Sequence, residues 1–140
     1  MKRFILSSAI VAIMVSCSTQ NTAIPEGAKA EMKAQKNTAD DKWEVIVMDP
    51  QYDTYINSVA KPMTMYTDES LRARNITLVA DWNSRYYSGR NPGFYEVPID
   101  YDPNENYGKE FNYRMYQFFA YLNWKYGVRF QGLSGADTLR

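Results

Sequence analysis

The sequence contains no histidine, and Cys17 is its one cysteine. The absence of histidine excludes a Ser-His-Asp triad, a histidine-ligated zinc ion and a histidine pH switch. A single cysteine excludes a disulfide within the chain, and its place at the end of an N-terminal leader leaves the folded domain without a cysteine nucleophile. We therefore expect no cofactor, and a fold that is held together by packing alone.

Neither sign of charge dominates, because 16 Lys and Arg side chains are matched by 16 Asp and Glu side chains. Removal of residues 1–16 takes away Lys2 and Arg3 and leaves 14 basic and 16 acidic side chains. Binding to a nucleic-acid backbone depends on clustered basic residues that release counterions. The near-neutral charge therefore argues against nucleic acid as a partner.

Residues 1–16 have the layout of a signal peptide: two basic residues, an apolar stretch, and a small residue before Cys17. The apolar stretch has about a dozen residues, too few for the ~20 that cross a bilayer. Met14-Val15-Ser16-Cys17 resembles the lipobox of bacterial lipoproteins, with methionine where leucine is usual. We expect cleavage before Cys17 and lipidation of its thiol; the alternative is an ordinary secretory leader that ends near a free cysteine.

The chain after Cys17 is polar up to residue 42, and we expect residues 17–42 to form the lipidated cysteine and a flexible tether. Acyl chains contribute ~0.8 kcal/mol per buried methylene, so several chains would hold the protein at a membrane. Surface-exposed lipoproteins of Bacteroidota often carry acidic residues soon after the cysteine, whereas residues 18–21 carry none. We therefore expect an outer-membrane anchor with the domain facing the periplasm.

Residues 43–130 are predicted to form one globular α+β domain, followed by a loose C-terminal tail over 131–140. Apolar runs of period two predict strands, and apolar residues at helical spacing between caps and breakers predict helices. The predicted order is β-α-α-β-α, with the helices packed on a minimal sheet of two or three strands. The first elements are a strand over 43–48, a helix capped by Asp49 that runs from Pro50 to residue 60 or 61, and a longer helix from 68 to about 88. They are followed by an edge strand over 94–101, a helix over 109–126 and a short third strand over 128–130.

The last helix has a second apolar face, which includes Tyr113, Tyr116 and Trp124. Either another element covers this face, or it is an exposed aromatic platform that binds a sugar or a partner protein. Burial is the more common outcome for such a face, and the platform is the candidate binding site.

Asp100, Asp102 and Asn104 place oxygen-bearing side chains at alternate positions, as a calcium loop does. The pattern then fails, because an EF-hand needs glycine at position six and glutamate at position twelve, where this chain has Glu105 and Phe111. A turn that leads into the last helix explains the same residues without a metal. Calcium is therefore only a weak candidate.

Glu96 and Asp100 are the carboxylates that could hydrolyse a glycan without histidine. On one strand they would lie roughly 13 Å apart, beyond the ~5 to 9.5 Å that glycosidases use. A small carboxylate-dependent hydrolase acting on an envelope glycan is the alternative function, and Asp81 or Asp102 could line its pocket.

Several short motifs occur in order between Trp43 and Tyr126. They are Asp49-Pro50 with Asp53, Asp81-Trp82-Asn83, Tyr95-Glu96, Tyr101-Asp102-Pro103, Tyr107-Gly108, Asn112-Tyr113 and Lys125-Tyr126. With them the chain resembles an uncharacterised family of Bacteroidota lipoproteins that is known as a domain of unknown function. The resemblance implies an envelope location and a single domain, and it carries no activity.

These patterns together predict a lipid-anchored envelope protein whose domain binds an envelope protein or glycan. The partners would be the membrane, through the anchor, and one further envelope component. We expect binding rather than catalysis.

Overall fold

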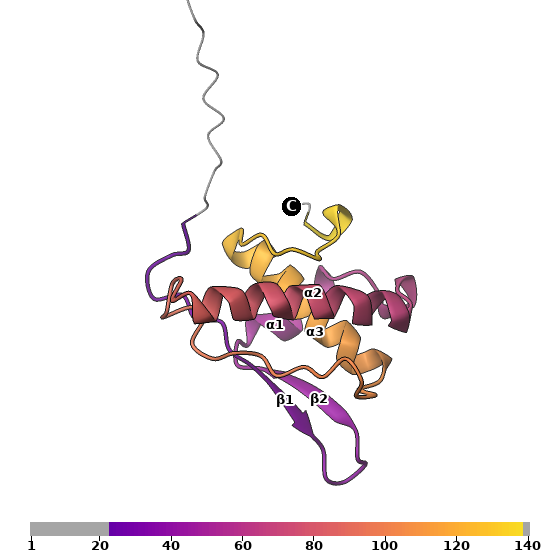
Figure 1. The fold of residues 1–140 in the computed structure, drawn as a ribbon. Coiled ribbons are helices and arrows are strands. Elements are labelled where there is room, and N and C mark those ends of the chain that lie inside the picture. Colours follow the sequence, from indigo (N-terminus) through magenta and orange to yellow (C-terminus); the bar gives the residue numbers. More distant parts are fainter. Residues whose placement is uncertain (1–22, 139–140) are drawn as a thin grey trace, which may run out of the picture.

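The computed structural model describes residues 23–138 of the 140-residue chain. It confirms a small α+β domain with one two-stranded sheet and three α-helices, in the order β-β-α-α-α (Figure 1). None of the helices in this described part combines the length and apolar character that a bilayer crossing requires. The elements are β1 (Met32–Lys36), β2 (Trp43–Val47), α1 (Gln51–Ser58), α2 (Asp68–Tyr87) and α3 (Lys109–Tyr126), with short 3-10 turns at Met63–Met65 and Gly135–Asp137.

Helix α3 is the centre of the domain. Twelve of its residues are buried, which is possible because α1, α2 and β2 pack around it and the C-terminal segment lies against it (Figure 1). Gly127 ends the helix in the left-handed conformation at φ 70°, which glycine adopts without strain. A helix buried on nearly all sides explains why α3 has two apolar faces.

Helix α2 lies across α3 (Figure 1). Thr67 caps it by accepting a hydrogen bond from the Ser70 amide at 3.2 Å, and Asp68 and Glu69 lie in its first turn. Its buried indole, Trp82, is the centre of an aromatic cluster. The rings around Trp82 belong to Phe94, Tyr95, Phe118, Phe119 and Phe130.

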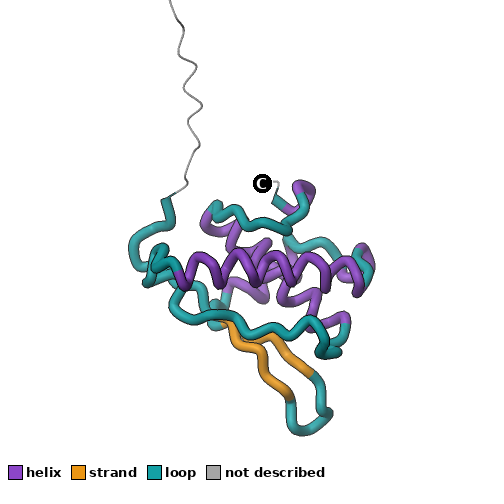
Figure 2. The backbone as a smooth tube through the Cα atoms, in the orientation of Figure 1, coloured by secondary structure: helices purple, strands orange, loops and turns teal. Residues whose placement is uncertain are grey.

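Strands β1 and β2 form an antiparallel hairpin that projects from the helical body (Figure 2). Part of the hairpin packs on the core, where Met32 of β1 and Val45 of β2 are buried. The prediction of a flexible tether up to residue 42 is therefore wrong for β1 and for the buried Ala30 before it. The polar sequence of β1 does not predict a strand, because only Met32 of its five residues is apolar and buried enough to give a pattern.

The segment 94–101 is not a strand, although Phe94, Tyr95 and Ile99 are buried. Side chains of α2 supply the hydrogen bonds that a neighbouring strand would have made. Trp82 Nε1 donates to the Val97 carbonyl at 2.8 Å. The Asn83 side chain donates to the Ile99 carbonyl and accepts from the Ile99 backbone amide. The third strand predicted over 128–130 is likewise absent from the described chain.

The tail from residue 131 onward is ordered as far as the description reaches, at residue 138, so the prediction of a loose tail is also wrong there. Arg74 donates to the Gly132 carbonyl at 3.0 Å, and the Gln131 amide donates to Asp81 at 2.8 Å. The tail ends in a turn that brings Asp137 against α3.

Candidate functional site

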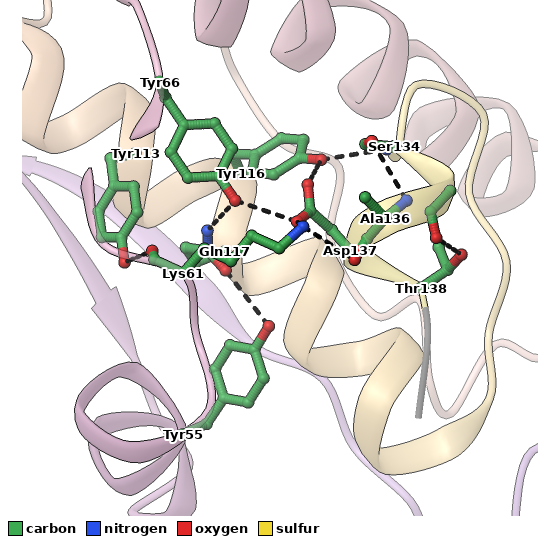
Figure 3. A network of polar contacts seen from close by, with 11 residues as sticks. Tyr55, Lys61, Tyr66, Tyr113, Tyr116, Gln117, Ser134, Ala136, Asp137 and Thr138 are labelled. Atoms are coloured by element: carbon green, nitrogen blue, oxygen red, sulfur yellow. Dashed lines mark hydrogen bonds and ion pairs between the residues drawn. The ribbon is translucent and has the colours of Figure 1, made fainter. Parts of the chain in front are cut away.

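Asp137 lies at the centre of a polar network between the C-terminal segment and α3 (Figure 3). The Tyr116 hydroxyl donates to its Oδ2 at 2.6 Å, and the Tyr66 hydroxyl donates to its Oδ1 at 3.2 Å. The Asp137 side chain is only 7% exposed. We call Lys61, Tyr66, Tyr116, Gln117 and Asp137 the Asp137 cluster.

Lys61 supplies the positive charge of the Asp137 cluster. Its Nζ lies 2.9 Å from Asp137 Oδ1 and donates to the Ala136 carbonyl at 2.9 Å (Figure 3). Burial would raise the pKa of Asp137, but the hydrogen bonds from Lys61 and Tyr116 outweigh burial and lower that pKa below its ordinary value. Asp137 is therefore a stable anion at neutral pH and a poor proton donor.

The network continues inward through two hydrogen bonds of the Gln117 side-chain amide. Gln117 Nε2 donates to the Tyr66 hydroxyl at 3.3 Å, and the Tyr55 hydroxyl donates to Gln117 Oε1 at 3.2 Å (Figure 3). Burial raises the pKa of Tyr66 to about 12 and raises the pKa of Tyr55 and Tyr116 further. These phenols are neutral donors, and their hydrogen bonds join α1, α3 and the C-terminal turn.

Two surface grooves lie on either side of the Lys61–Asp137 pair, and both are lined by these two residues. The smaller, about 150 Å³, also contains Val59 and Trp124, which are 48% and 39% exposed. The larger, about 420 Å³, contains Met65, which is 67% exposed. Besides Lys61, the hydroxyl and cationic groups of the larger groove belong to Tyr66, Thr67, Ser70, Arg74 and Ser134.

A second charged cluster joins the start of α1 to the end of α3. Asp49 Oδ2 accepts from Tyr121 at 2.6 Å and from Lys125 at 2.5 Å. Burial works against ionisation of Asp49, but these bonds prevail and lower its pKa. Asp49 Oδ1 also accepts from the amide of Gln51, the first residue of α1, at 3.1 Å. An adjoining groove of about 330 Å³ has a floor that includes Phe118 and Leu122.

The predicted aromatic face is largely part of the core. Tyr116 is fully buried and Tyr113 is 7% exposed, and the Tyr113 hydroxyl donates to the Lys61 carbonyl at 2.7 Å. These two rings therefore do not form an exposed platform, because the Tyr66 ring packs against both and the C-terminal turn bonds to the Tyr116 hydroxyl. Trp124 remains partly exposed, at the edge of the smaller groove.

The weak calcium candidates occupy a turn. Asp102 Oδ1 accepts from both the amide and the side-chain nitrogen of Asn104, at 2.8 and 3.1 Å. Within residues 23–138, no group of three or more acidic or cysteine side chains is placed to hold a metal ion. The bonds between Asp102 and Asn104 thus form a turn, which explains the pattern of oxygens without a metal.

The carboxylates considered for hydrolysis are not gathered in one pocket. Asp81 forms a two-pronged pair with Arg85, at 3.0 and 2.8 Å, and Glu96 lies 3.2 Å from Lys29. A groove of about 290 Å³ is lined by Glu96 but not by Asp81 or Asp102. The geometry therefore brings no acid and base of this set together.

Asp137 was missed by sequence reasoning because it lies in a short polar tail without periodicity. One signal was present. The chain has 12 tyrosines, and a buried tyrosine hydroxyl needs an acceptor. Asp137 is the one acidic side chain in residues 131–140 and was therefore a candidate acceptor, although the sequence does not say which tyrosine bonds to it. The predicted lipidation site, Cys17, lies outside the described residues.

Fold and site together define a small α+β domain in which Asp49, Asp81 and Asp137 are held in hydrogen-bonded ion pairs. A family model described as "Family of unknown function (DUF6146)" matches residues 4–138, so the chain belongs to that family. Comparison with curated proteins and with solved structures found no match to either.

Proposed function

We propose that this protein is a lipid-anchored component of the bacterial cell envelope, and that its domain binds another envelope component without catalysing a reaction. The observation that carries the proposal is the leader over residues 1–16, which ends in a small residue before Cys17. In support, the family match begins at residue 4 and so includes Cys17.

We further propose that the family is one of Bacteroidota lipoproteins, as the motifs between Trp43 and Tyr126 suggest. The absence of acidic residues over 18–21 favours retention on the periplasmic side of the outer membrane. The described domain begins only a few residues beyond that stretch, because Ile24 already packs against the core. The domain would therefore stay close to the lipid headgroups.

The state of the carboxylates supports binding rather than catalysis. Asp49, Asp81 and Asp137 each lie in an ion pair, with Lys125, Arg85 and Lys61 respectively. A general acid needs a pKa raised toward neutral pH, whereas the pKa values of Asp49 and Asp137 are lowered. These groups stabilise the fold and are poorly suited to donate protons.

The surface best suited to a partner is the pair of grooves beside the Lys61–Asp137 pair. Its exposed apolar side chains, Val59, Met65 and Trp124, surround a charged centre. Aromatic side chains and methionine are enriched in protein interfaces, so Trp124 and Met65 are the anchors that a partner would contact beside the charged pair. An envelope protein or a glycan is the class of partner that this mixed surface fits.

Anchoring is tested by labelling cells with palmitate and comparing the wild-type chain with Cys17→Ser. We expect label on the wild-type chain, no label on the variant, and loss of the variant from the membrane fraction. Label on both chains, or equal fractionation, would count against the anchor.

Binding is tested by placing a photo-crosslinking amino acid at Met65, with Tyr87 as the matched control. Tyr87 is 75% exposed and lies at the opposite end of the 20-residue helix α2, ~30 Å away. We expect a discrete adduct from position 65, weakened by Trp124→Ala, and none from position 87. Equal adducts from both positions would indicate random encounter.

A further inference from the structure

Within residues 23–138, strand β1 pairs on one side with β2 and has no strand on its other side. The Met48 amide donates to the Glu31 carbonyl at 3.2 Å, and the Asn37 amide donates to the Lys42 carbonyl at 2.7 Å. Because hydrogen-bonded and non-hydrogen-bonded pairs alternate along an antiparallel ladder, the odd-numbered residues from 31 to 37 bond to β2. The backbone groups of Met32, Ala34 and Lys36 therefore point away from β2.

The described part of the chain supplies no hydrogen-bond partner to that edge. No hydrogen bond from a turn, a loop or a side chain within residues 23–138 reaches the backbone of Met32, Ala34 or Lys36. The last four residues of β1 are exposed, and the hairpin projects beyond the helices (Figure 1). The β2 side differs, because Trp43 donates to Glu105 in the loop before α3. Such an edge is a template for another strand.

We propose that β1 pairs with β1 of a second copy of this chain, antiparallel and centred on Ala34. In that register Ala34 lies opposite Ala34, and Met32 lies opposite Lys36, so all the free backbone groups find partners. About six main-chain hydrogen bonds form. The result is a continuous four-stranded sheet. The helices of both copies lie on the same side of it, because paired residues point to the same face.

The charges of β1 suit this self-pairing. Lys33 lies opposite Gln35, and Lys36 is already paired with Asp41 at 3.0 Å in its own hairpin. A register shifted so that Met32 faces Ala34 would place Lys33 directly opposite Lys33, which is destabilising. The centred register avoids opposed like charges, and the small Ala34 side chain at its centre leaves room for two strands to approach. The inference concerns the domain and does not depend on lipidation.

The register is tested by disulfide cross-linking of the purified full-length chain in a Cys17→Ser background, with Ala34→Cys and Gln35→Cys compared. In the centred register the two Cα atoms at position 34 lie ~5.5 Å apart, within the range of a disulfide. The two Cα atoms at position 35 are about 8 Å apart, outside that range. We expect at least a tenfold greater yield of covalent dimer from Ala34→Cys. Equal yields, or none from position 34, would overturn the proposal.

The backbone contact is tested by Ala34→Pro, with Ala34→Ser as the matched control that keeps the amide. Proline removes an N–H that the hairpin itself does not use, so an edge strand tolerates it. We expect the Cys17→Ser chain and its Ala34→Ser variant to be dimers by light scattering, and the Ala34→Pro variant to be a monomer with an unchanged circular dichroism spectrum. A monomeric parent chain, or a dimer that survives proline, would contradict the pairing.

Discussion

The Tyr116 hydroxyl donates a hydrogen bond to Asp137 Oδ2 at 2.6 Å, joining the middle of the central helix to a residue close to the C-terminus. The same hydroxyl accepts a hydrogen bond from the Ser134 amide at 3.1 Å. One buried side chain of α3 thus holds two points of the C-terminal turn. The turn is part of the fold, and with Lys61 it forms the ridge between the two grooves proposed as the binding surface.

Asp137→Asn should destabilise the domain. The substitution removes the charge that Lys61 and two tyrosines stabilise, and hydrogen bonds to a charged group contribute ~2 kcal/mol. Chemical denaturation should therefore show a loss of about that size. The matched control is Asp53→Asn, because the Asp53 side chain is 76% exposed and lies 3.7 Å from Arg114. The control should leave stability nearly unchanged, and an equal loss in both variants would contradict the role given to Asp137.

The stability of the domain should fall in acid. The pKa of Asp137 is lowered from 3.8, so between the two pKa values the unfolded chain binds more protons than the folded chain. The contribution of Asp137 is complete above pH 3.8 and is lost as the pH falls through the lower folded value. Asp49 acts in the same direction. Denaturation midpoints measured from pH 6 to pH 2 should fall less steeply for Asp137→Asn than for wild type, and parallel profiles would refute the assignment.

Asn83→Asp should loosen the segment between α2 and α3. The Asn83 amide donates to the Ile99 carbonyl at 2.9 Å and accepts from the Ile99 amide at 2.8 Å, and a carboxylate can make only the second bond. An unsatisfied buried carbonyl costs about 1 to 3 kcal/mol. Limited proteolysis should then cut within 97–107 faster than in wild type. Asn106→Asp is the control that should leave the cutting rate unchanged, because Asn106 is exposed in the same segment and its side chain makes no hydrogen bond within residues 23–138.

Two tryptophans should differ sharply when replaced by alanine. Trp82 is buried among five rings, so Trp82→Ala should cost about 3 to 5 kcal/mol. Trp124 is 39% exposed at the edge of the smaller groove, so Trp124→Ala should lower the melting temperature far less while weakening the adduct formed from position 65. A large loss of stability from Trp124→Ala would assign Trp124 to the core.

The helices could be predicted because their limits depend on local chemistry. The capping Thr67 and the terminal Gly127 mark the start of α2 and the end of α3, and both helices lie within a residue of the predicted ranges. Strand β2 was also predicted, because its apolar, β-branched sequence belongs to a strand whatever its partner. The α+β class followed from these elements.

The failures involve segments whose structure depends on distant partners. Strand β1 forms because its backbone hydrogen-bonds to β2, whereas its own sequence is that of a polar linker. The stretch around Ile99 has strand-like alternation, yet Asn83 on α2 takes its hydrogen bonds. The sequence did not predict the Asp137 cluster for the same reason, because nothing near Asp137 in the sequence indicates that Tyr116 will contact it.

The most direct test of the account is the mass of the mature protein isolated from the envelope. We predict that the first residue is Cys17, that residues 1–16 are absent, and that the N-terminal peptide carries the added mass of a diacylglyceryl group and an amide-linked acyl chain. An N-terminal peptide with an unmodified Cys17 thiol, or one that retains the leader, would contradict the account.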